Sequence, residues 1–390
     1  MAENRAPVSS SRAKPGQPLV VGAGPTGLTT ALMLARQGQA VRIIDRNAAP
    51  TAESRALVIN HRTLDLLRDT GLTEKFLAIG HLVKGLKLTI HGRTKARVDL
   101  AIIPHAVRGL LVVPQNFTER LLADALREVG VLVERRTEFM AATMDPHGGD
   151  IQLKTGDAHE ACRVSWLIGA DGADSVVRKA LEFDFKGAAS AYTWSLVDLE
   201  LGPEAEPRDI EICLASGFPA LFRIPLGGNR HRVLCNGPDV EEMLPENWEP
   251  GAIHWQGQFT TPHRMTDRRL LGRGALIGDA AHRHSPAGGR GINLGIEDAV
   301  TLAGLIGETS SIDPKLMSRE MEEQMRNRFR AWERDRLART RSTLAVSDRL
   351  QALATNPTGW QLFTLPLALR FIGLLPSVRR EVLALLTDLQ

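Results

Sequence analysis

Residues 19–28, Leu19-Val20-Val21-Gly22-Ala23-Gly24-Pro25-Thr26-Gly27-Leu28, decide the fold of this chain. The three apolar residues that open the stretch predict a short buried strand, and the apolar periodicity from Pro25 to Arg36 predicts a helix. A second apolar run, Ala40 to Ile44, predicts another strand. A strand, a glycine-rich turn, a helix and a strand in this order are typical of a βαβ unit that binds a dinucleotide.

The glycines of the turn match the pattern G-x-G-x-x-G, and each has a physical task. Gly22 permits the tight turn, Gly24 leaves room for a pyrophosphate beside backbone N–H groups, and Gly27 lets the helix pack close to the strand. Asp45 ends the second strand, where a carboxylate can bind ribose hydroxyls. The pattern does not separate FAD from NAD. The cofactor-binding residues expected here are Gly22, Gly24, Pro25, Thr26, Gly27, Asp45 and Arg46.

The composition is that of a soluble globular enzyme. The 390 residues are 43% hydrophobic and 24% charged, and the net charge of +3 is too small to indicate a nucleic-acid partner. Cys162, Cys213 and Cys235 have neither the spacing of a zinc site nor that of a disulfide framework, which favours a reducing, cytoplasmic location and no metal. No uncharged apolar run is long enough to predict an integral membrane segment.

Two later motifs indicate which class of dinucleotide-binding protein this is. The first is Gly169-Ala170-Asp171-Gly172-Ala173-Asp174-Ser175-Val176-Val177-Arg178. The second is Gly278-Asp279-Ala280-Ala281-His282, which continues through Pro286, Gly288, Gly289, Gly291 and Asn293 to Asp298-Ala299. Together with the first turn, they resemble the three fingerprints of the single-component flavoprotein aromatic hydroxylases, the para-hydroxybenzoate hydroxylase-like family. The stretch from Ser54 to Leu72 most resembles the branch that hydroxylates phenols and aromatic polyketides.

The resemblance implies a fold class and a division of the chain. The class is α/β, a Rossmann-like FAD-binding domain of the GR2 type with an inserted β-rich substrate domain and C-terminal helices. We expect a flexible tail over 1–18, the FAD-binding domain over 19–185 and 266–330, the substrate domain over 186–265 and a helical region over 331–390. Part of 80–110 would join the substrate sheet. Residues 60–80 predict one helix.

The resemblance also implies roles for particular residues. Asp279 would bind the ribityl chain of FAD, Gln115 would lie near the adenosine or ribityl part, and Arg55 near the flavin edge. The Asp171-Gly172 segment would contact FAD and NAD(P)H, and Arg178 would either add charge there or form a structural ion pair. Further FAD-binding residues implied are Gly278, Pro286, Gly289, Gly291, Ile292 and Asn293; those nearest the chemistry are Arg55, Pro286, Gly288 and Gly289.

The segment from Pro286 to Gly291 carries the most chemistry. Its small residues let backbone approach a flavin ring, and the positive end of the helix that opens after Gly291 would stabilise the anion of reduced flavin. His282 and His284 are more typical of packing and hydrogen bonding than of catalysis, and their spacing does not make a metal site.

The implied activity is that of a FAD-dependent monooxygenase. NADPH or NADH would reduce FAD, O₂ would give a flavin C4a-hydroperoxide, and a phenolic or polyketide-like ring would take one oxygen. By strand alternation we expect Tyr192, Trp194, Phe222 and Arg223 near the substrate, with half of such positions facing away. The substrate, the base, the choice between hydroxylation, Baeyer–Villiger and epoxidation chemistry, and the choice between a monomer and a homodimer stay open.

Three alternatives share the fold: a flavin-dependent halogenase, a related reductase and a non-catalytic flavin-binding protein. The halogenase signature has two tryptophans where this chain has Leu221-Phe222-Arg223-Ile224-Pro225, which favours hydroxylation. The chain also departs from the hydroxylase pattern. Glu297 and Thr301 stand where the family often has Gln and Asn, and Trp332-Glu333-Arg334 replaces a longer Tyr-containing motif.

Overall fold

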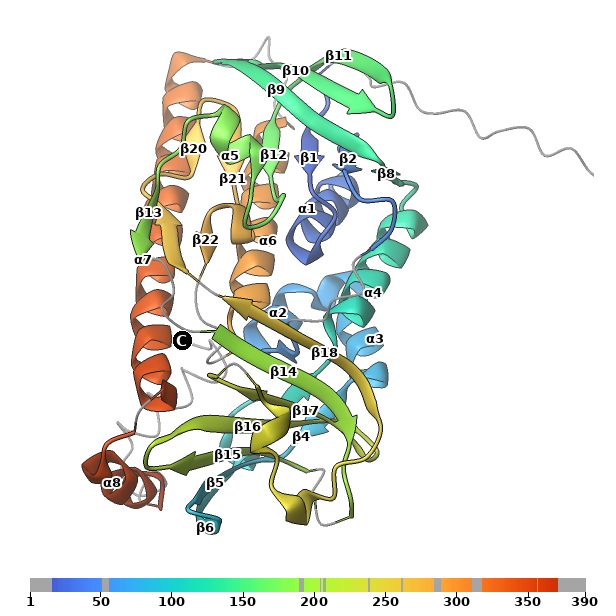
Figure 1. The fold of residues 1–390 in the computed structure, drawn as a ribbon. Coiled ribbons are helices and arrows are strands. Elements are labelled where there is room, and N and C mark those ends of the chain that lie inside the picture. Colours follow the sequence, from blue (N-terminus) through green and yellow to red (C-terminus); the bar gives the residue numbers. More distant parts are fainter. Residues whose placement is uncertain are drawn as a thin grey trace, which may run out of the picture.

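The computed structural model of this chain describes residues 16–50, 56–188, 193–203, 205, 208–237, 239–260, 262–283, 289–310, 318–355 and 357–370. Figure 1 shows two sheet-containing parts, one above the other, with the long helix α7 along one side. The expected α/β class with C-terminal helices is confirmed.

The upper part is built on a six-stranded sheet with the order β20-β21-β12-β1-β2-β8. β1 lies between β12 and β2, and every neighbouring pair is parallel except the β20–β21 edge. The strands are β1 (Leu19–Val21), β2 (Arg42–Asp45), β8 (Val133–Arg135), β12 (Leu167–Gly169), β20 (Leu270–Leu271) and β21 (Gly274–Leu276). The predicted βαβ unit is therefore the centre of the sheet.

Each face of this sheet has its own core, because successive side chains of a strand point to opposite faces. Val20 packs under the helices α1 (Pro25–Arg36), α4 (Gln115–Glu128) and α6 (Gly291–Ser310). Leu19 and Val21 pack on the other face against a three-stranded sheet. Its strands are β9 (Thr137–Asp145), β10 (Gly148–Thr155) and β11 (Ala158–Val164).

The lower part is a seven-stranded sheet with the order β18-β14-β17-β16-β15-β5-β6. Five strands come from one stretch of chain: β14 (Thr193–Glu200), β15 (Asp209–Ala215), β16 (Phe218–Gly227), β17 (Arg230–Cys235) and β18 (Ile253–Thr260). β5 (Gly85–Ile90) and β6 (Arg93–Asp99) arrive from the N-terminal half, and β5 runs parallel to β15. Residues far apart in the sequence thus share this sheet.

Two small sheets connect the parts. One pairs β3 (Val58–Ile59), β7 (Leu110–Val112) and β4 (His81–Val83). The other pairs β13 (Phe185–Ala188), β19 (His263–Thr266) and β22 (His282–Arg283). Short helices complete the fold: η2 (Leu100–Ile102), α5 (Val176–Ala180), η3 (Glu241–Met243), η4 (Glu246–Trp248) and η5 (Gly278–Ala280).

The single helix expected over 60–80 is wrong. The structure has α2 (His61–Leu66), η1 (Arg68–Thr70) and α3 (Leu72–Ile79). Gly71 adopts a left-handed conformation with φ 74° between the last two. A residue without Cβ takes this conformation at little cost, so the helical pattern breaks there although its apolar positions continue.

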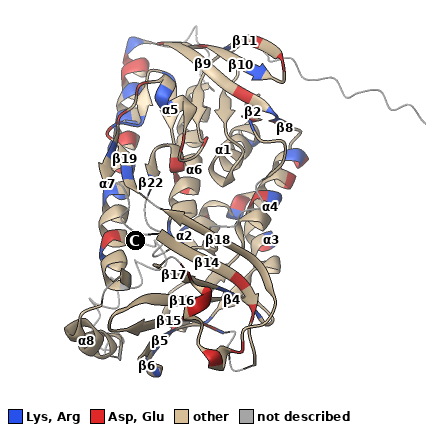
Figure 2. Cartoon of the chain, viewed as in Figure 1, with Lys and Arg blue, Asp and Glu red and all other residues tan. Residues whose placement is uncertain are grey.

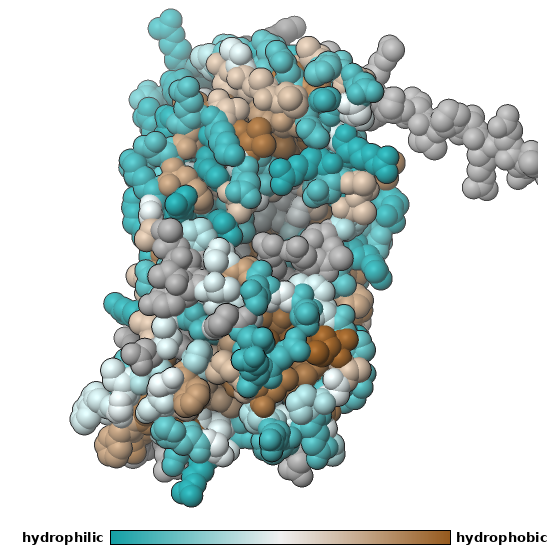
Figure 3. All heavy atoms as spheres, in the orientation of Figure 1, coloured by the Kyte–Doolittle hydropathy of each residue, from teal (hydrophilic) through white to brown (hydrophobic). Residues whose placement is uncertain are grey.

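The C-terminal helices support both parts. α7 (Arg319–Thr355) runs across residue 330, where the expected FAD-binding and C-terminal regions meet, and the division of the chain into these regions stays a prediction. α8 (Gly359–Arg370) packs Leu362, Leu365 and Leu369 against the lower sheet and leaves Trp360 74% exposed. Figure 3 shows hydrophobic side chains at the surface in the lower left corner, where α8 lies in Figure 1.

Charged residues recur along the outer helices and also occur on strands and loops of both parts. Figure 2 shows them along α7 and α4, whereas α1 is mostly tan. Among the described residues, no helix has both the length and the apolar character needed to cross a membrane.

Candidate functional site

The turn after β1 has the tight geometry that its sequence predicts. Gly22 has φ 102°, and a Cβ there would lie 2.4 Å from the carbonyl oxygen of Ala170. A Cβ on Gly27 would lie 1.9 Å from the carbonyl oxygen of Gly22. A Cβ on Gly24 would meet nothing within 4 Å. Two glycines therefore serve close packing, and the third leaves open space in front of the first N–H groups of α1, where an anion fits.

Asp45 lies at the carboxyl end of β2 and is 9% exposed. Its carboxylate accepts hydrogen bonds from the backbone N–H of Ala23 at 2.8 Å and of Asn47 at 2.7 Å. Arg135 lies 3.7 Å away. These contacts hold the carboxylate beside the glycine turn. A contact with ribose through the remaining lone pairs stays a prediction, as does a role for the exposed Arg46.

In the second motif, the carboxylate of Asp171 is occupied by hydrogen bonds from neighbouring groups of the protein. It accepts hydrogen bonds from the Ser175 hydroxyl and from the N–H groups of Val176 and Val177 at the start of α5. Burial raises the pKa of Asp171, and these hydrogen bonds oppose that rise. Gly172 has φ 80° and open space around its Cα. Contact with FAD would therefore come from the backbone of this turn more than from the carboxylate.

Arg178 has a structural environment. Its guanidinium donates to the carbonyl oxygens of Ala280 and Ala173, each at 2.8 Å, and lies 4.0 Å from the ring centroid of Phe185. It thus ties the second motif to the third. Of the two roles expected for Arg178, the structural one has direct contacts in the structure.

The third motif meets the first at Thr26. A Cβ on Gly278 would lie 2.6 Å, and one on Gly295 2.3 Å, from the Thr26 hydroxyl oxygen. Asp279, between them in the chain, is exposed, and among the described residues it has no hydrogen-bond or ion-pair partner. An exposed carboxylate at the junction of the motifs has the position and the acceptor capacity expected for binding a polyhydroxyl chain.

A fully buried carboxylate, Asp298, holds the third motif in place. It accepts hydrogen bonds from Arg269 and Arg336, each at 2.8 Å, and lies 3.0 Å from Nε2 of His282. Burial alone would raise its pKa, but the two guanidinium groups hold the pKa of Asp298 far below its usual range. His282 is also fully buried, so the packing role expected for it agrees with its surroundings.

Asn293, in the first turn of α6, joins that helix to β3 and α2. Its side-chain oxygen accepts from the Asn60 N–H and the Thr63 hydroxyl, and its amide donates to the carbonyls of Val58 and Gly289. The side chain is 3% exposed. The Asn293 side chain therefore fixes the position of the Gly289 turn. Contacts with FAD would then come from the backbone groups of Gly291, Ile292 and Asn293. Pro286, Gly288 and His284 lie outside the described residues.

Gln115 opens α4 and lies beside the chain that follows β2. Its carbonyl oxygen accepts from the Ala56 N–H at 3.3 Å, and its amide donates to Glu119 at 2.9 Å. Burial raises the pKa of Glu119. The predicted roles of Gln115 and of Arg55 at the cofactor stay predictions, and Arg55 lies outside the described residues.

The residues expected at the substrate divide between the two faces of the lower sheet. Phe222 and Arg223 are neighbours on β16 and therefore point to opposite faces. Trp194 and Phe222 share one face, with ring centroids 5.9 Å apart. Arg223 is 1% exposed on the other face, bound to Glu211. Arg223 thus faces away from Trp194 and Phe222. The substrate role expected for these residues stays a prediction, and Tyr192 lies outside the described residues.

The two faces differ in how completely they are covered. On the central strands β16 and β17, the face of Arg223 has Leu221 and Val233 at most 6% exposed, under η3 and η4. We call it the covered face. On the opposite face, α8 packs against a cluster that includes the fully buried Trp194, but Phe222, Ile224 and Leu234 on the central strands stay partly exposed, together with Ile212 on β15. We call it the open face.

The open face lies next to the third motif. Val58 is 3.4 Å from the Cβ position of Gly289, and both Val58 and Ile224 pack on one cluster of buried side chains. The same face carries Asp198 and Arg232, which the sequence did not single out. A partly exposed apolar surface beside the Gly289 turn is where an aromatic ring can meet a cofactor held by the three motifs.

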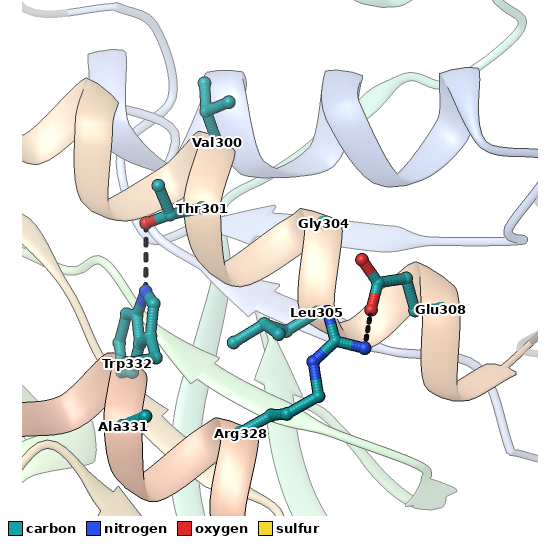
Figure 4. Close-up of a pocket in the computed structure, with 8 residues that line it drawn as sticks. All are labelled: Val300, Thr301, Gly304, Leu305, Glu308, Arg328, Ala331 and Trp332. Carbon is teal, nitrogen blue, oxygen red and sulfur yellow. Dashed lines mark hydrogen bonds and ion pairs between the residues drawn. The ribbon is translucent and has the colours of Figure 1, made fainter. Parts of the chain in front are cut away.

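The departures from the family pattern are compensated locally. Glu297 forms an ion pair with Arg336 at 2.9 Å and lies 3.3 Å from Arg339. Trp332 donates from its indole N–H to the Thr301 hydroxyl at 2.9 Å. Figure 4 shows this bond at one end of a surface pocket between α6 and α7, with Glu308 and Arg328 paired at the other end. These hydrogen bonds and ion pairs hold α7 against α6, and the pocket between the two helices does not include the glycine turns.

No group of three or more His, Cys, Asp and Glu side chains in the described part of the chain is arranged to hold a metal ion. The fit to FAD rests on different features. The open space at Gly24 suits a pyrophosphate, the exposed Asp279 suits a ribityl chain, and the partly exposed face beyond Gly289 suits a ring. The residues present therefore fit a flavin dinucleotide.

Comparisons with known proteins agree with this geometry. Residues 17–235 and 238–312 match the family described as FAD binding domain, and the chain belongs to that family. It is 31% identical over 73% of its length to an uncharacterized aromatic compound monooxygenase, YhjG, of Bacillus subtilis, covering 60% of that protein. It is 33% identical over 74% of its length to 6-methylpretetramide 4-monooxygenase of Streptomyces rimosus, covering 55% of that protein.

The chain thus spans somewhat more than half the length of these curated relatives. Among solved structures, it superposes on p-nitrophenol 4-monooxygenase PnpA of Pseudomonas putida with a TM-score of 0.82 and 19% identity, covering 96% of this chain and 99% of that one. At this identity the likeness concerns the fold. The predicted aromatic hydroxylase resemblance is confirmed.

Proposed function

We propose that this protein is a FAD-dependent monooxygenase that uses NAD(P)H and O₂ to hydroxylate a phenolic or polyketide-like aromatic ring. The observation that carries the proposal is that the first motif meets the second at Gly22 and the third at Thr26, with the partly exposed apolar face of a second sheet beside the third motif. The names of two relatives, an uncharacterized aromatic compound monooxygenase and a 6-methylpretetramide 4-monooxygenase, support the same class.

When bound, FAD would supply the redox chemistry that couples NAD(P)H oxidation to the transfer of one oxygen atom from O₂ to the ring. The chain supplies binding. The N–H groups at the start of α1 take the pyrophosphate, and Asp279 takes the ribityl hydroxyls. The positive end of α6, after Gly291, favours negative charge at the adjoining ring edge.

The second task of the chain is to orient the substrate and exclude water. Phe222, Ile224 and Leu234 offer an apolar wall, and Asn293 keeps the Gly289 turn at a fixed distance from β3. Exclusion of water from such a site suppresses wasteful side reactions of reactive species. A reducing cytoplasm is part of the proposal, because the three described cysteines are free.

The purified protein tests the proposal. We expect bound FAD and oxidation of NADPH or NADH that is stimulated by an aromatic substrate, with a product heavier by one oxygen atom. Flavin that is never reduced by NAD(P)H, with any of a panel of phenols and naphthoquinones, would favour a non-catalytic flavin-binding protein. Reduction of the substrate without oxygen transfer would favour a reductase, and halide incorporation a halogenase.

A further inference from the structure

The open face carries one buried ion pair in an otherwise apolar surface. Across the strands, Asp198 on β14 is the register partner of Arg232 on β17, and Arg232 of Ile224 on β16. Arg232 donates from Nε to Oδ1 of Asp198 at 2.5 Å and from Nη2 to Oδ2 at 2.7 Å. The two residues are 1% and 7% exposed. Leu196 and Leu234, two residues further along the same strands, are apolar.

Trp255 on the edge strand covers this pair. It is the register partner of Asp198, and the Arg232 guanidinium carbon lies 5.1 Å from its ring centroid. A Cβ on Gly257 would lie 3.2 Å from the indole ring, so this glycine leaves room for the ring to lie along the open face. Trp255 itself stays partly exposed. An ion pair stacked under an indole ring is held in a fixed geometry.

A second pair of the same chemistry lies on the covered face and provides the contrast. Glu211 accepts from Arg223 at 2.8 Å and from the Thr89 hydroxyl at 2.6 Å, and Lys87 lies 3.2 Å away. Its acceptor positions are thus occupied by three different donors. Among the described residues, Asp198 accepts side-chain hydrogen bonds from Arg232 alone. A carboxylate offers about four lone-pair positions, so Asp198 keeps acceptor capacity that Glu211 has filled.

Each oxygen of Asp198 accepts one hydrogen bond from Arg232 and keeps a lone pair that a further donor can use. On the open face that donor can come from a ligand. We propose that Asp198, neutralised by Arg232, is a specificity-determining residue that accepts a hydrogen bond from a hydroxyl group of the aromatic substrate and excludes aromatic carboxylates. The proposal rests on the proposed function, which places the substrate on this face.

The charges decide which polar group is accepted. Asp198 and Arg232 sum to zero, so a neutral hydroxyl adds no charge to the surface. A substrate carboxylate would bring a second negative charge beside Asp198 and lose its own hydration, while Arg232 is already paired with Asp198. The pair therefore favours a hydroxylated ring over the acid of the same ring.

The test compares three probes that share one ring: 2-naphthol, 2-methoxynaphthalene and 2-naphthoate. Dissociation constants are measured by equilibrium dialysis on the FAD-loaded protein, without NAD(P)H. We expect wild-type protein to bind 2-naphthol about tenfold or more tightly than the other two, since an unmet donor or an added charge costs at least that much. A wild-type protein that binds the three probes equally, or binds none of them, overturns the proposal.

The variant Asp198→Asn keeps the shape and leaves Arg232 with a net positive charge. We expect its preference for 2-naphthol over 2-naphthoate to fall at least tenfold. The matched control is Glu211→Gln, which makes the same change beside Arg223 on the covered face and should keep the wild-type ratio. An unchanged ratio in Asp198→Asn, or an equal change in both variants, contradicts the proposal.

A third variant keeps the proposal testable if Asp198→Asn does not fold. The double replacement Asp198→Leu with Arg232→Met removes both charges, a change that buried pairs often tolerate. It should bind 2-naphthol and 2-methoxynaphthalene within threefold of each other, and a retained tenfold preference overturns the proposal. Absence of FAD binding or of NAD(P)H oxidation would instead contradict the proposed function, because the binding ratios are measured without turnover.

Discussion

Two buried arginine–carboxylate pairs, on opposite faces of one sheet, have the same chemistry and different surroundings. Glu211 and Arg223 lie on the covered face, where Thr89 and Lys87 complete the carboxylate. Asp198 and Arg232 lie on the open face, where the neighbouring apolar side chains stay partly exposed. The first pair is satisfied by the protein alone, and the second is completed by a ligand in our proposal.

The contrast shows why burial alone does not identify a functional residue. Both arginines are 1% exposed, and each is paired with an acid. What separates them is the number of donors around the acid and the face to which it points. A carboxylate that the fold fully satisfies contributes to stability, whereas an incompletely satisfied one beside a partly exposed apolar surface indicates a recognition role.

The largest expected effect is on the covered pair. Glu211→Gln leaves Arg223 buried without a neutralising partner, and we expect the free energy of unfolding to fall by about 3–5 kcal/mol. Burial favours the neutral form of Glu211, but hydrogen bonds from Thr89 and Arg223 keep its pKa below the usual value. Urea denaturation followed by tryptophan fluorescence measures the loss.

The control for this loss is Glu128→Gln, which breaks an exposed ion pair with Lys75. That change should alter the free energy of unfolding by less than about 1 kcal/mol. If Glu211→Gln cost no more than the surface control, the covered pair would not have the structural role assigned to it.

A smaller loss is expected on the open face. Asp198→Asn also leaves a buried arginine unpaired, but Asp198 is bound by one donor residue and lies beside partly exposed side chains. We expect the free energy of unfolding to fall by about 2–3 kcal/mol, below the loss for Glu211→Gln. The same urea titration decides the order, and the reverse order would contradict the assignment of the two faces.

A pH effect of about 2 kcal/mol should arise on the covered face. Burial, with a contribution from the neighbouring Arg223, lowers the pKa of His231 from 6.5 to about 4. Between these values the unfolded chain takes up a proton that the folded chain does not, so stability is full above about pH 6.5 and is lost as the pH falls. Between pH 7 and pH 5 we expect a loss of about 2 kcal/mol from this group.

His231→Gln should remove that part of the pH dependence. Urea unfolding of both proteins at pH 7 and pH 5 gives the difference, and other titrating groups cancel in the comparison. Equal slopes with pH in the two proteins would mean that His231 titrates alike in the folded and unfolded states.

The smallest expected effect is that of Trp255→Leu. The change removes the aromatic face over Arg232 and keeps an apolar side chain on the open face. We expect a loss of about 1 kcal/mol in unfolding free energy and a weaker preference for 2-naphthol over 2-naphthoate. A stronger preference would mean that Trp255 blocks access to the pair and does not hold it in place.

Local patterns predicted much of the upper part. The strand, the glycine turn and the helix over residues 19–36 follow from short-range sequence signals, and the structure has them at those residues. The break of the expected 60–80 helix depends on one glycine with positive φ, Gly71. A periodic apolar pattern that continues through the glycine hides such a break.

Long-range partnerships could not be predicted in the same way. Asp298 belongs to a recognised motif, but its partners Arg269 and Arg336 lie 29 and 38 residues away in the sequence. Asp198 and Arg232 are 34 residues apart and meet only because β14 and β17 pair in one register. Strand alternation puts Phe222 and Arg223 on opposite faces, but only the observed register shows that Trp194 shares the face of Phe222 and which face is covered.

The most direct test of the central claim is the visible spectrum of the purified protein, followed by denaturation and by oxygen-consumption assays with phenols. We predict flavin absorption bands, release of FAD on denaturation, and NAD(P)H oxidation that a phenolic substrate stimulates, with a product that gains one oxygen atom. A colourless protein that cannot be reconstituted with FAD would contradict the account.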